Sequence, residues 1–107
     1  MASGRLAGLD LTTANTDQQL YACPGSKVAC ATVSLCNRNN STSLVRLALC
    51  TTTSPATTDY LVFDQAIPAN ESLERAGIVL AAGQYLYVRT NQSGVSAVAF
   101  GYEETPS

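Results

Sequence analysis

The sequence predicts an all-β fold: a single-domain antiparallel β-sandwich, jelly-roll or Ig-like, with about eight strands. Turn-forming residues recur at intervals of roughly eight to twelve residues, which is typical of sandwiches and barrels. The segments between them are rich in β-branched and aromatic residues, which favour strands. The 107 residues have the usual size of one domain and contain no visible repeat or linker. We therefore expect one domain over 1–107, with short flexible ends near 1–4 and 104–107.

The turn segments divide the chain into the expected strands. Each turn contains Gly, Pro, Asn or several small hydroxyl residues, which adopt turn conformations readily. The turns are Pro24-Gly25, Asn37–Ser43, Thr51–Thr58, Ile67–Asn70, Ala81–Gln84 and Asn91–Gly94. The strands expected around them are, in order, Leu6–Leu11, Gln18–Cys23, Val28–Cys36, Ser43–Cys50, Tyr60–Asp64, Ser72–Leu80, Gln84–Thr90 and Val95–Tyr102.

The segment Ser72–Leu80 allows two interpretations. Asn70 is a suitable N-cap, the apolar residues that follow have helical spacing, and Gly83 is placed to end a helix. Against a helix stand Gly77 and the β-branched pair Ile78-Val79, which favour extended backbone. We expect a strand.

Alternation in two cysteine-containing strands predicts a hairpin. The odd-numbered residues of Val28–Cys36 and Leu44–Cys50 are apolar, so they form the buried face of each strand. If Asn37–Ser43 connects the two, residues whose numbers sum to 80 lie opposite one another, and a slip of two residues keeps the faces but changes the partners. The core pairs are then Leu35 with Val45, Val33 with Leu47 and Ala31 with Leu49, and the outer pairs are Ser34 with Arg46, Thr32 with Ala48, Cys30 with Cys50 and Cys36 with Leu44.

The four cysteines fit a packing role better than metal binding or catalysis. Cys30 and Cys36 lie six residues apart on one expected strand, about 20 Å from each other, so they cannot share a metal ion. No CxxC motif and no His occur in the chain, so we expect no metal site. The alternative to four free thiols is one disulfide between Cys30 and Cys50 of the expected hairpin. This disulfide would raise the free energy of unfolding by roughly 3 kcal/mol. A reducing cytosol would keep that pair as thiols.

Composition and motifs exclude several classes of function. The net charge of −2 and the pI near 4.8 leave no basic cluster for phosphate, so we expect no nucleic acid partner. No window resembles an export signal or a membrane span, so we expect no membrane partner. The absence of His removes the commonest general base, and no GxGxxG or P-loop motif occurs. We therefore expect no enzyme, no catalytic residue and no cofactor.

One strand presents residue types that are enriched in protein interfaces. In Gln84–Thr90 the alternation places Tyr85, Tyr87 and Arg89 on one face, opposite the apolar core residues. Tyrosine and arginine recur in protein contact patches, and five of the six basic residues are Arg. Together with Arg46 on the outer face of its own strand, these three residues are the expected interface. The alternative is that both tyrosines cover the rim of their own core.

From about Leu9 to Glu104 the chain resembles small virion proteins of tailed bacteriophages, particularly those of marine cyanobacteria. The resemblance rests on the order of "DLTTANTDQQLYACPGSKVACATVSLCNRN", "VRLAL", "DYLVFDQAIPANESLERAGIVLAAGQYLYVR" and "VSAVAFGYEE". Its most distinctive pieces are "CNRN" and "LERAGIVLAAGQ". It supplies no catalytic residues, and it also favours the strand at Ser72–Leu80.

The resemblance implies a non-enzymatic virion structural protein, an oligomeric β-sandwich on the exterior of the particle. Capsid decoration, or cement, is the first expectation. The alternative is a tail or fibre component with a receptor- or carbohydrate-binding role. The implied partners are the chain itself, as a trimer, and other virion proteins, with a surface glycan under the alternative. The implied location is the virion, after assembly in the cytoplasm of the bacterial host.

Overall fold

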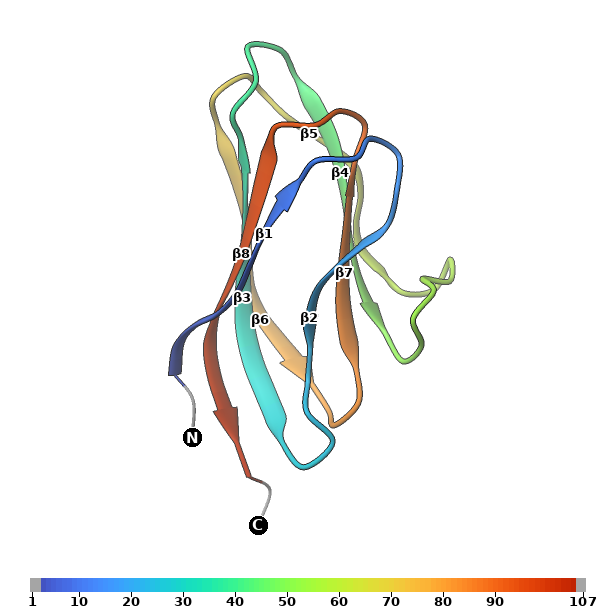
Figure 1. The fold of residues 1–107 in the computed structure, drawn as a ribbon, viewed down its shortest axis with the longest axis vertical. Helices are drawn as coiled ribbons and strands as arrows, with labels where there is room; N and C mark the ends of the chain where they lie inside the picture. The colour runs from blue at the N-terminus through green and yellow to red at the C-terminus, as the bar shows by residue number, and fades with distance from the viewer. Residues whose placement is uncertain (1–2, 106–107) are drawn as a thin grey trace.

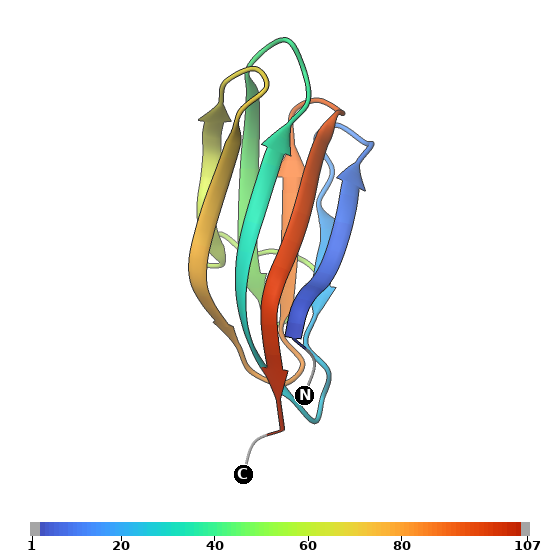
Figure 2. The same cartoon turned by 90° about the vertical axis from the view of Figure 1, so that its left-hand side faces the viewer.

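The computed structural model describes residues 3–105 and consists of two four-stranded antiparallel sheets packed face to face (Figures 1 and 2). Sheet 1, which faces the viewer in Figure 2, contains in spatial order β1 (Ser3–Leu11), β8 (Val95–Glu104), β3 (Val28–Asn37) and β6 (Ser72–Leu80). Sheet 2 contains β2 (Gln18–Ala22), β7 (Tyr85–Thr90), β4 (Ser43–Cys50) and β5 (Tyr60–Ile67).

The strands pair as one long hairpin that has been rolled up. β1 pairs with β8, β2 with β7, β3 with β6 and β4 with β5. Rolling adds the pairs β3 with β8 and β4 with β7, which complete the two sheets. This is the order of a jelly roll, so the predicted eight-stranded sandwich is confirmed and the jelly roll is the form it takes.

All eight expected strands are present, with shifted ends. Residues 72–80 form β6 and no helix, because Gly77 adopts a left-handed φ of 73° inside an extended segment. β1 begins at Ser3, and β8 continues to Glu104, so parts of the segments expected to be flexible lie in strands. Residues 1, 2, 106 and 107, which the same expectation covers, lie outside the described residues.

Alternate residues of the strands meet between the sheets and form the core. On β3 and β4 these are the odd-numbered positions that the alternation predicts, and on β8 they are small residues. Small side chains on β8 let the sheets approach, because a sandwich core is only about 10 Å thick. The buried residues of these three strands that form the core are Ala29, Ala31, Val33, Leu35, Val45, Leu47, Val95, Ala97 and Ala99.

The predicted hairpin between the third and fourth strands is wrong. β3 pairs with β6 and β8, whereas β4 pairs with β5 and β7, so the connection after Asn37 crosses from sheet 1 to sheet 2. The buried faces were assigned correctly, but they oppose each other across the core instead of lying side by side. The proposed neighbours Leu35 and Val45, and the six other pairs of that register, are therefore not hydrogen-bonded partners.

The observed strand pairing places Cys30 and Cys50 in different sheets. Cys30 lies on the outer face of sheet 1 between Tyr102 and Val79, and Cys50 lies on the outer face of sheet 2 beside Tyr85. Two sheets and the core separate them, so a Cys30–Cys50 disulfide is geometrically excluded. All four cysteines are free.

Alkylation of the native protein without reductant is expected to follow exposure. Cys36 is exposed and reacts first, whereas Cys23 and Cys50 are buried and react only on unfolding. Burial and the nearby Asp59 carboxylate raise the pKa of the Cys50 thiol to about 11, which further lowers its thiolate fraction. Mass spectrometry after timed treatment with iodoacetamide at pH 8 measures the order. A disulfide-linked peptide pair, or Cys50 modified as fast as Cys36, would contradict the structure.

Polar side chains tie the sheets together at both ends of the sandwich. At one end the buried Asn37 amide holds the loops that follow β3 and β5. At the other end the Tyr21 hydroxyl on β2 donates a hydrogen bond to the Glu103 carboxylate on β8. Burial and this hydrogen bond raise the pKa of Tyr21 well above its ordinary value, so the hydroxyl remains a donor.

Each edge strand of the two sheets carries at least one extra residue, whereas the inner pairs are regular. The register of β1 shifts after Arg5, that of β2 after Gln19 and that of β6 opposite Ala31–Val33, each by one residue, and β5 shifts twice against β4. The β3–β8 and β4–β7 ladders run without a shift. Bulges twist an edge and interrupt its row of hydrogen-bonding groups, which prevents another strand from adding there.

Candidate interaction site

The four residues expected at an interface lie together on the outer face of sheet 2. Leu86 and Val88 of β7 point into the core, which places Tyr85, Tyr87 and Arg89 outside. Arg46 of β4 lies directly opposite Arg89 in the β4–β7 ladder. The structure thus joins residues that are more than forty positions apart in sequence.

Tyr87 is largely covered within its own chain. It retains 9% of its surface and packs with Ala48 and Cys50 in a small second apolar cluster, which Tyr60 and Tyr85 partly cover. Its hydroxyl donates a hydrogen bond of 3.3 Å to Gln19 on β2. Tyr87 therefore supports the face from beneath, and Tyr85, which is half-buried, is the more accessible tyrosine of the predicted pair.

Arg46 is held in a fixed position by three neighbours on β5. Its Nε and a terminal nitrogen donate to the two carboxylate oxygens of Asp64, at 2.7 and 3.2 Å. Its guanidinium carbon lies 4.1 Å from the centre of the Phe63 ring and 5.9 Å from that of Tyr60. Such fork geometry and stacking restrain an arginine. The pairing also lowers the pKa of Asp64 and raises that of Arg46.

The bulge in β5 positions these partners. Val62 and Ile67 are both buried although their spacing is odd, so one extra residue must lie between them. Asp64 sits there with a positive φ of 51°, and Phe63 beside it is 56% exposed. Phe63 and Asp64 are not among the residues predicted at the site, although the odd spacing of Val62 and Ile67 is a signal that can be read from the sequence.

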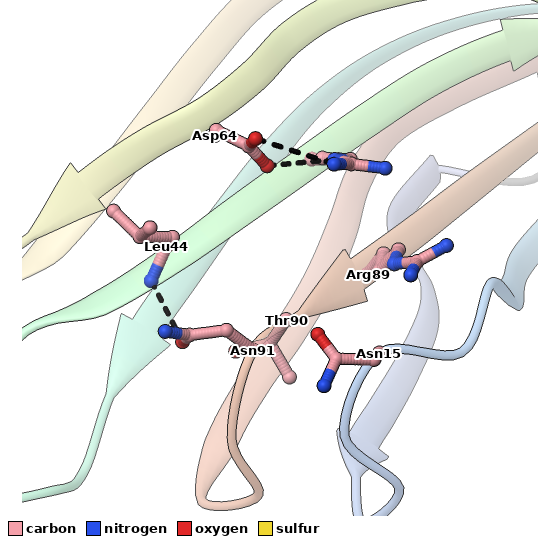
Figure 3. A pocket seen from close by; sticks show the side chains of 7 residues that line it. Asn15, Leu44, Asp64, Arg89, Thr90 and Asn91 are labelled. Carbon is pink, nitrogen blue, oxygen red and sulfur yellow. Dashed lines mark hydrogen bonds and ion pairs between the residues drawn. The ribbon is translucent and has the colours of Figure 1, made fainter.

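A hollow of about 160 Å³ is lined by both arginines. Figure 3 shows Arg89, Asp64, Asn91 and Asn15 around it. Arg89 reaches Asp17 only at 4.0 Å, so its guanidinium is less engaged than that of Arg46. The side-chain oxygen of Asn91 accepts a hydrogen bond of 2.9 Å from the backbone N–H of Leu44. The lining residues are Asn15, Leu44, Arg46, Asp64, Arg89, Thr90 and Asn91.

Other candidate features of the described residues are simpler. No group of three or more His, Cys, Asp or Glu in residues 3–105 is placed to hold a metal ion. In that same range no helix is long and apolar enough to cross a membrane. The outer face of sheet 1 exposes Phe100, Tyr102 and Val79, which form a second apolar surface on the opposite side of the molecule.

The loops after β3 and β7 form a polar cluster at one end of the sandwich. The side-chain amide of Asn39 donates to the Ser93 carbonyl at 2.7 Å, and that of Gln92 donates to the Ser43 hydroxyl at 2.8 Å and to the Thr42 carbonyl at 3.1 Å. These cross-links hold the two loops in one arrangement.

Comparison with known proteins gives structural likeness only. No protein-family model matches the chain, and no curated protein matches it. Two crystal structures of a pentameric capsid protein isolated from metagenomic phage sequences are similar to it, with a TM-score of 0.46 and 18% sequence identity. The likeness covers 92% of this chain and 62% and 63% of those chains, so this chain spans less than two thirds of their length.

Proposed function

We infer that the protein is a non-enzymatic structural component of a bacteriophage virion, which self-associates through the outer face of sheet 2. Capsid decoration on the particle exterior is the first expectation, and a trimer is the first expected assembly. The observation that carries the proposal is the gathering of Tyr85, Arg89, Arg46 and Phe63 on the outer face of sheet 2, where Phe63 is exposed and the other three are half-buried. The resemblance of the sequence to small virion proteins supplies the biological setting.

The chemistry of this face supports protein contact. Tyrosine, phenylalanine and arginine are enriched in protein interfaces. Tyrosine and arginine are also enriched among the residues that contribute most of the binding energy. Phe63 and Arg46 are already stacked and paired, so little side-chain freedom is lost when a partner covers them.

The bulged edges support association through a face. A second copy cannot easily extend either sheet, because all four edge strands are irregular. The jelly roll also occurs in viral capsid and lectin domains, which is an analogy of fold and not evidence of function.

Two matched substitutions test which face assembles. We expect Phe63→Ser to shift the purified protein from oligomer to monomer in sedimentation-velocity experiments. Phe100→Ser, which removes an exposed phenylalanine from the outer face of sheet 1, should leave the oligomer intact. Thermal melts of both variants check that each remains folded.

Attachment to the particle requires a second measurement. The protein should co-sediment with empty capsids of the matching phage, and less with its isolated tails. A strict monomer that binds neither capsids nor tails would overturn the proposed function. Dissociation by Phe100→Ser and not by Phe63→Ser would move the self-contact to sheet 1, and an assembly other than a trimer would correct the stoichiometry.

The cross-linked loop cluster favours a second candidate, a tail or fibre component that binds a surface carbohydrate. Its polar groups from Asn39 and Gln92 are fixed before any ligand arrives, as sugar recognition requires. A glycan array probed with the assembled protein tests this role. An absence of signal at high protein concentration would remove it.

A further inference from the structure

We propose that the hollow between Arg46 and Arg89 binds a carboxylate group, contributed by an Asp or Glu side chain of a second copy of this chain. The proposal rests on the proposed self-association and names the chemistry at its centre. The chain carries eight acidic residues, among which Glu71 is exposed and lies in the turn between β5 and β6, outside the strands of sheet 1. Within residues 3–105 Glu71 forms no ion pair, so it is available to a neighbour.

The two arginines repel each other, and a negatively charged group between them would reduce this repulsion. Arg46 and Arg89 are direct cross-strand partners, and like charges in that position destabilise a sheet. Asp64 neutralises Arg46 with two hydrogen bonds, but Asp17 approaches Arg89 only to 4.0 Å. The lining therefore has two positive charges and one negative charge, and Asp17, which lies outside the lining, pairs with Arg89 only at 4.0 Å and without a hydrogen bond. A carboxylate that accepts hydrogen bonds from Arg89 would supply the close partner that this arginine lacks.

The donors in the hollow suit a planar anion. The guanidinium of Arg89 offers parallel N–H groups that match the two oxygens of a carboxylate. The side-chain oxygen of Asn91 is engaged by Leu44, which leaves the amide N–H groups of that residue as donors. Asn15, on the far side of the hollow, adds a second amide (Figure 3).

The same lining argues against a phosphate or an acidic sugar. A phosphate group carries up to two negative charges, which exceeds what one weakly paired arginine can offset. A sugar ring usually stacks on an aromatic side chain, and none lines the hollow. Phe63 and Tyr60 lie instead against the Arg46 guanidinium. A short acidic side chain from a protein fits these constraints best.

Titration with sodium acetate tests the site directly. In ¹⁵N-labelled protein, kept below the concentration at which it assembles, acetate should shift the Nε–H signals of Arg89 and Arg46 saturably. Sodium chloride at equal ionic strength should not. Arg89→Gln should weaken acetate binding at least tenfold, because a hydrogen-bonded ion pair is lost. Arg5→Gln, at an exposed arginine of sheet 1, should leave it unchanged.

The second part of the experiment measures how acetate affects oligomerisation. At concentrations where the protein oligomerises, acetate should lower the assembled mass more than matched chloride does, and Arg89→Gln should weaken the oligomer. Linear shifts shared with chloride, or acetate binding unaffected by Arg89→Gln, would overturn the carboxylate site. Glucuronate that binds more tightly than acetate would overturn the protein source in favour of a sugar.

The outcomes separate this inference from the proposed function. An oligomer that is indifferent to acetate and to Arg89→Gln would leave self-association standing and overturn the carboxylate contact. A strict monomer that binds acetate saturably would overturn both the self-association and the assignment of the carboxylate to a second copy.

Discussion

Gly101→Ala is expected to lower the free energy of unfolding by about 2–4 kcal/mol, through strain and overpacking together. Gly101 lies on β8 where that strand passes Ala31 of β3, and its φ of 148° is one that residues with a side chain rarely adopt. A Cβ at this position would overlap the backbone carbonyl oxygen of Cys30. The two central strands of sheet 1 would have to separate, which disrupts an otherwise regular ladder. Urea unfolding followed by circular dichroism measures the loss.

Alanine substitutions at two other glycines distinguish the effect of backbone strain from that of overpacking. Gly77→Ala introduces a side chain at a left-handed φ of 73° but into open space, so about 1–2 kcal/mol is expected. Gly25→Ala has open space and no left-handed φ, so a change within about 0.5 kcal/mol is expected. A Gly101→Ala variant that is as stable as Gly25→Ala would show that β8 does not approach β3 as closely as described.

The strands were predictable because alternation is a local property. Each strand has one face in a common core, so the apolar period of two is written into every segment independently. The ambiguous segment 72–80 was settled by Gly77 and by the β-branched pair after it, and the structure agrees. Strand ends were less certain, since the extension of β5 to Ile67 depends on a bulge.

The partners of the strands were not predictable in the same way. Alternation identifies the buried face of a strand but not the sheet that contains it, and a short loop fits a hairpin as well as a crossing between sheets. The crossing after Asn37 is fixed by contacts from residues far along the chain, including the carbonyl of Ile67. In the sequence Asn37 is only one of several asparagines at this turn, and its burial, which marks it as the anchor, comes from the structure.

In the candidate site, too, the residues on one strand were predictable and their neighbours on other strands were not. Tyr85 and Arg89 follow from alternation within one strand, and Arg46 from alternation within another. That the two arginines are direct neighbours follows from the β4–β7 pairing, which alternation within a strand does not reveal. Asn15 belongs to a turn more than seventy residues from Arg89, and no local pattern marks it as part of the hollow.

Asn37→Ala is expected to be the most destabilising of these changes, at about 3–5 kcal/mol. The Asn37 side chain is fully buried, and its amide N–H groups are shared among the carbonyl oxygens of Ser41, Ile67 and Pro68 at 2.9, 3.0 and 3.2 Å. Its oxygen accepts hydrogen bonds from the Asn39 backbone and the Ser43 hydroxyl. Alanine removes the partner of all these groups, and two of the lost hydrogen bonds, from the Asn37 amide to the Ile67 carbonyl and from the Ser43 hydroxyl to the Asn37 oxygen, are buried. Each buried group left unsatisfied costs about 1–3 kcal/mol.

Asn37→Asp distinguishes lost hydrogen bonds from lost volume, because it keeps the shape and replaces the donor with an acceptor. The introduced carboxylate would face three carbonyl oxygens, so burial and repulsion raise its pKa in the folded state above the unfolded value. Between those two values the folded protein binds more protons than the unfolded chain, so the stability of the variant falls as pH rises through this window. Urea unfolding of both variants between pH 4 and pH 8 measures this, with Asn40→Ala at an exposed asparagine of the same loop as the control. Equal stability of Asn37→Ala and Asn40→Ala, or an Asn37→Asp variant that gains stability toward pH 8, would show that Asn37 does not anchor the crossing between the sheets.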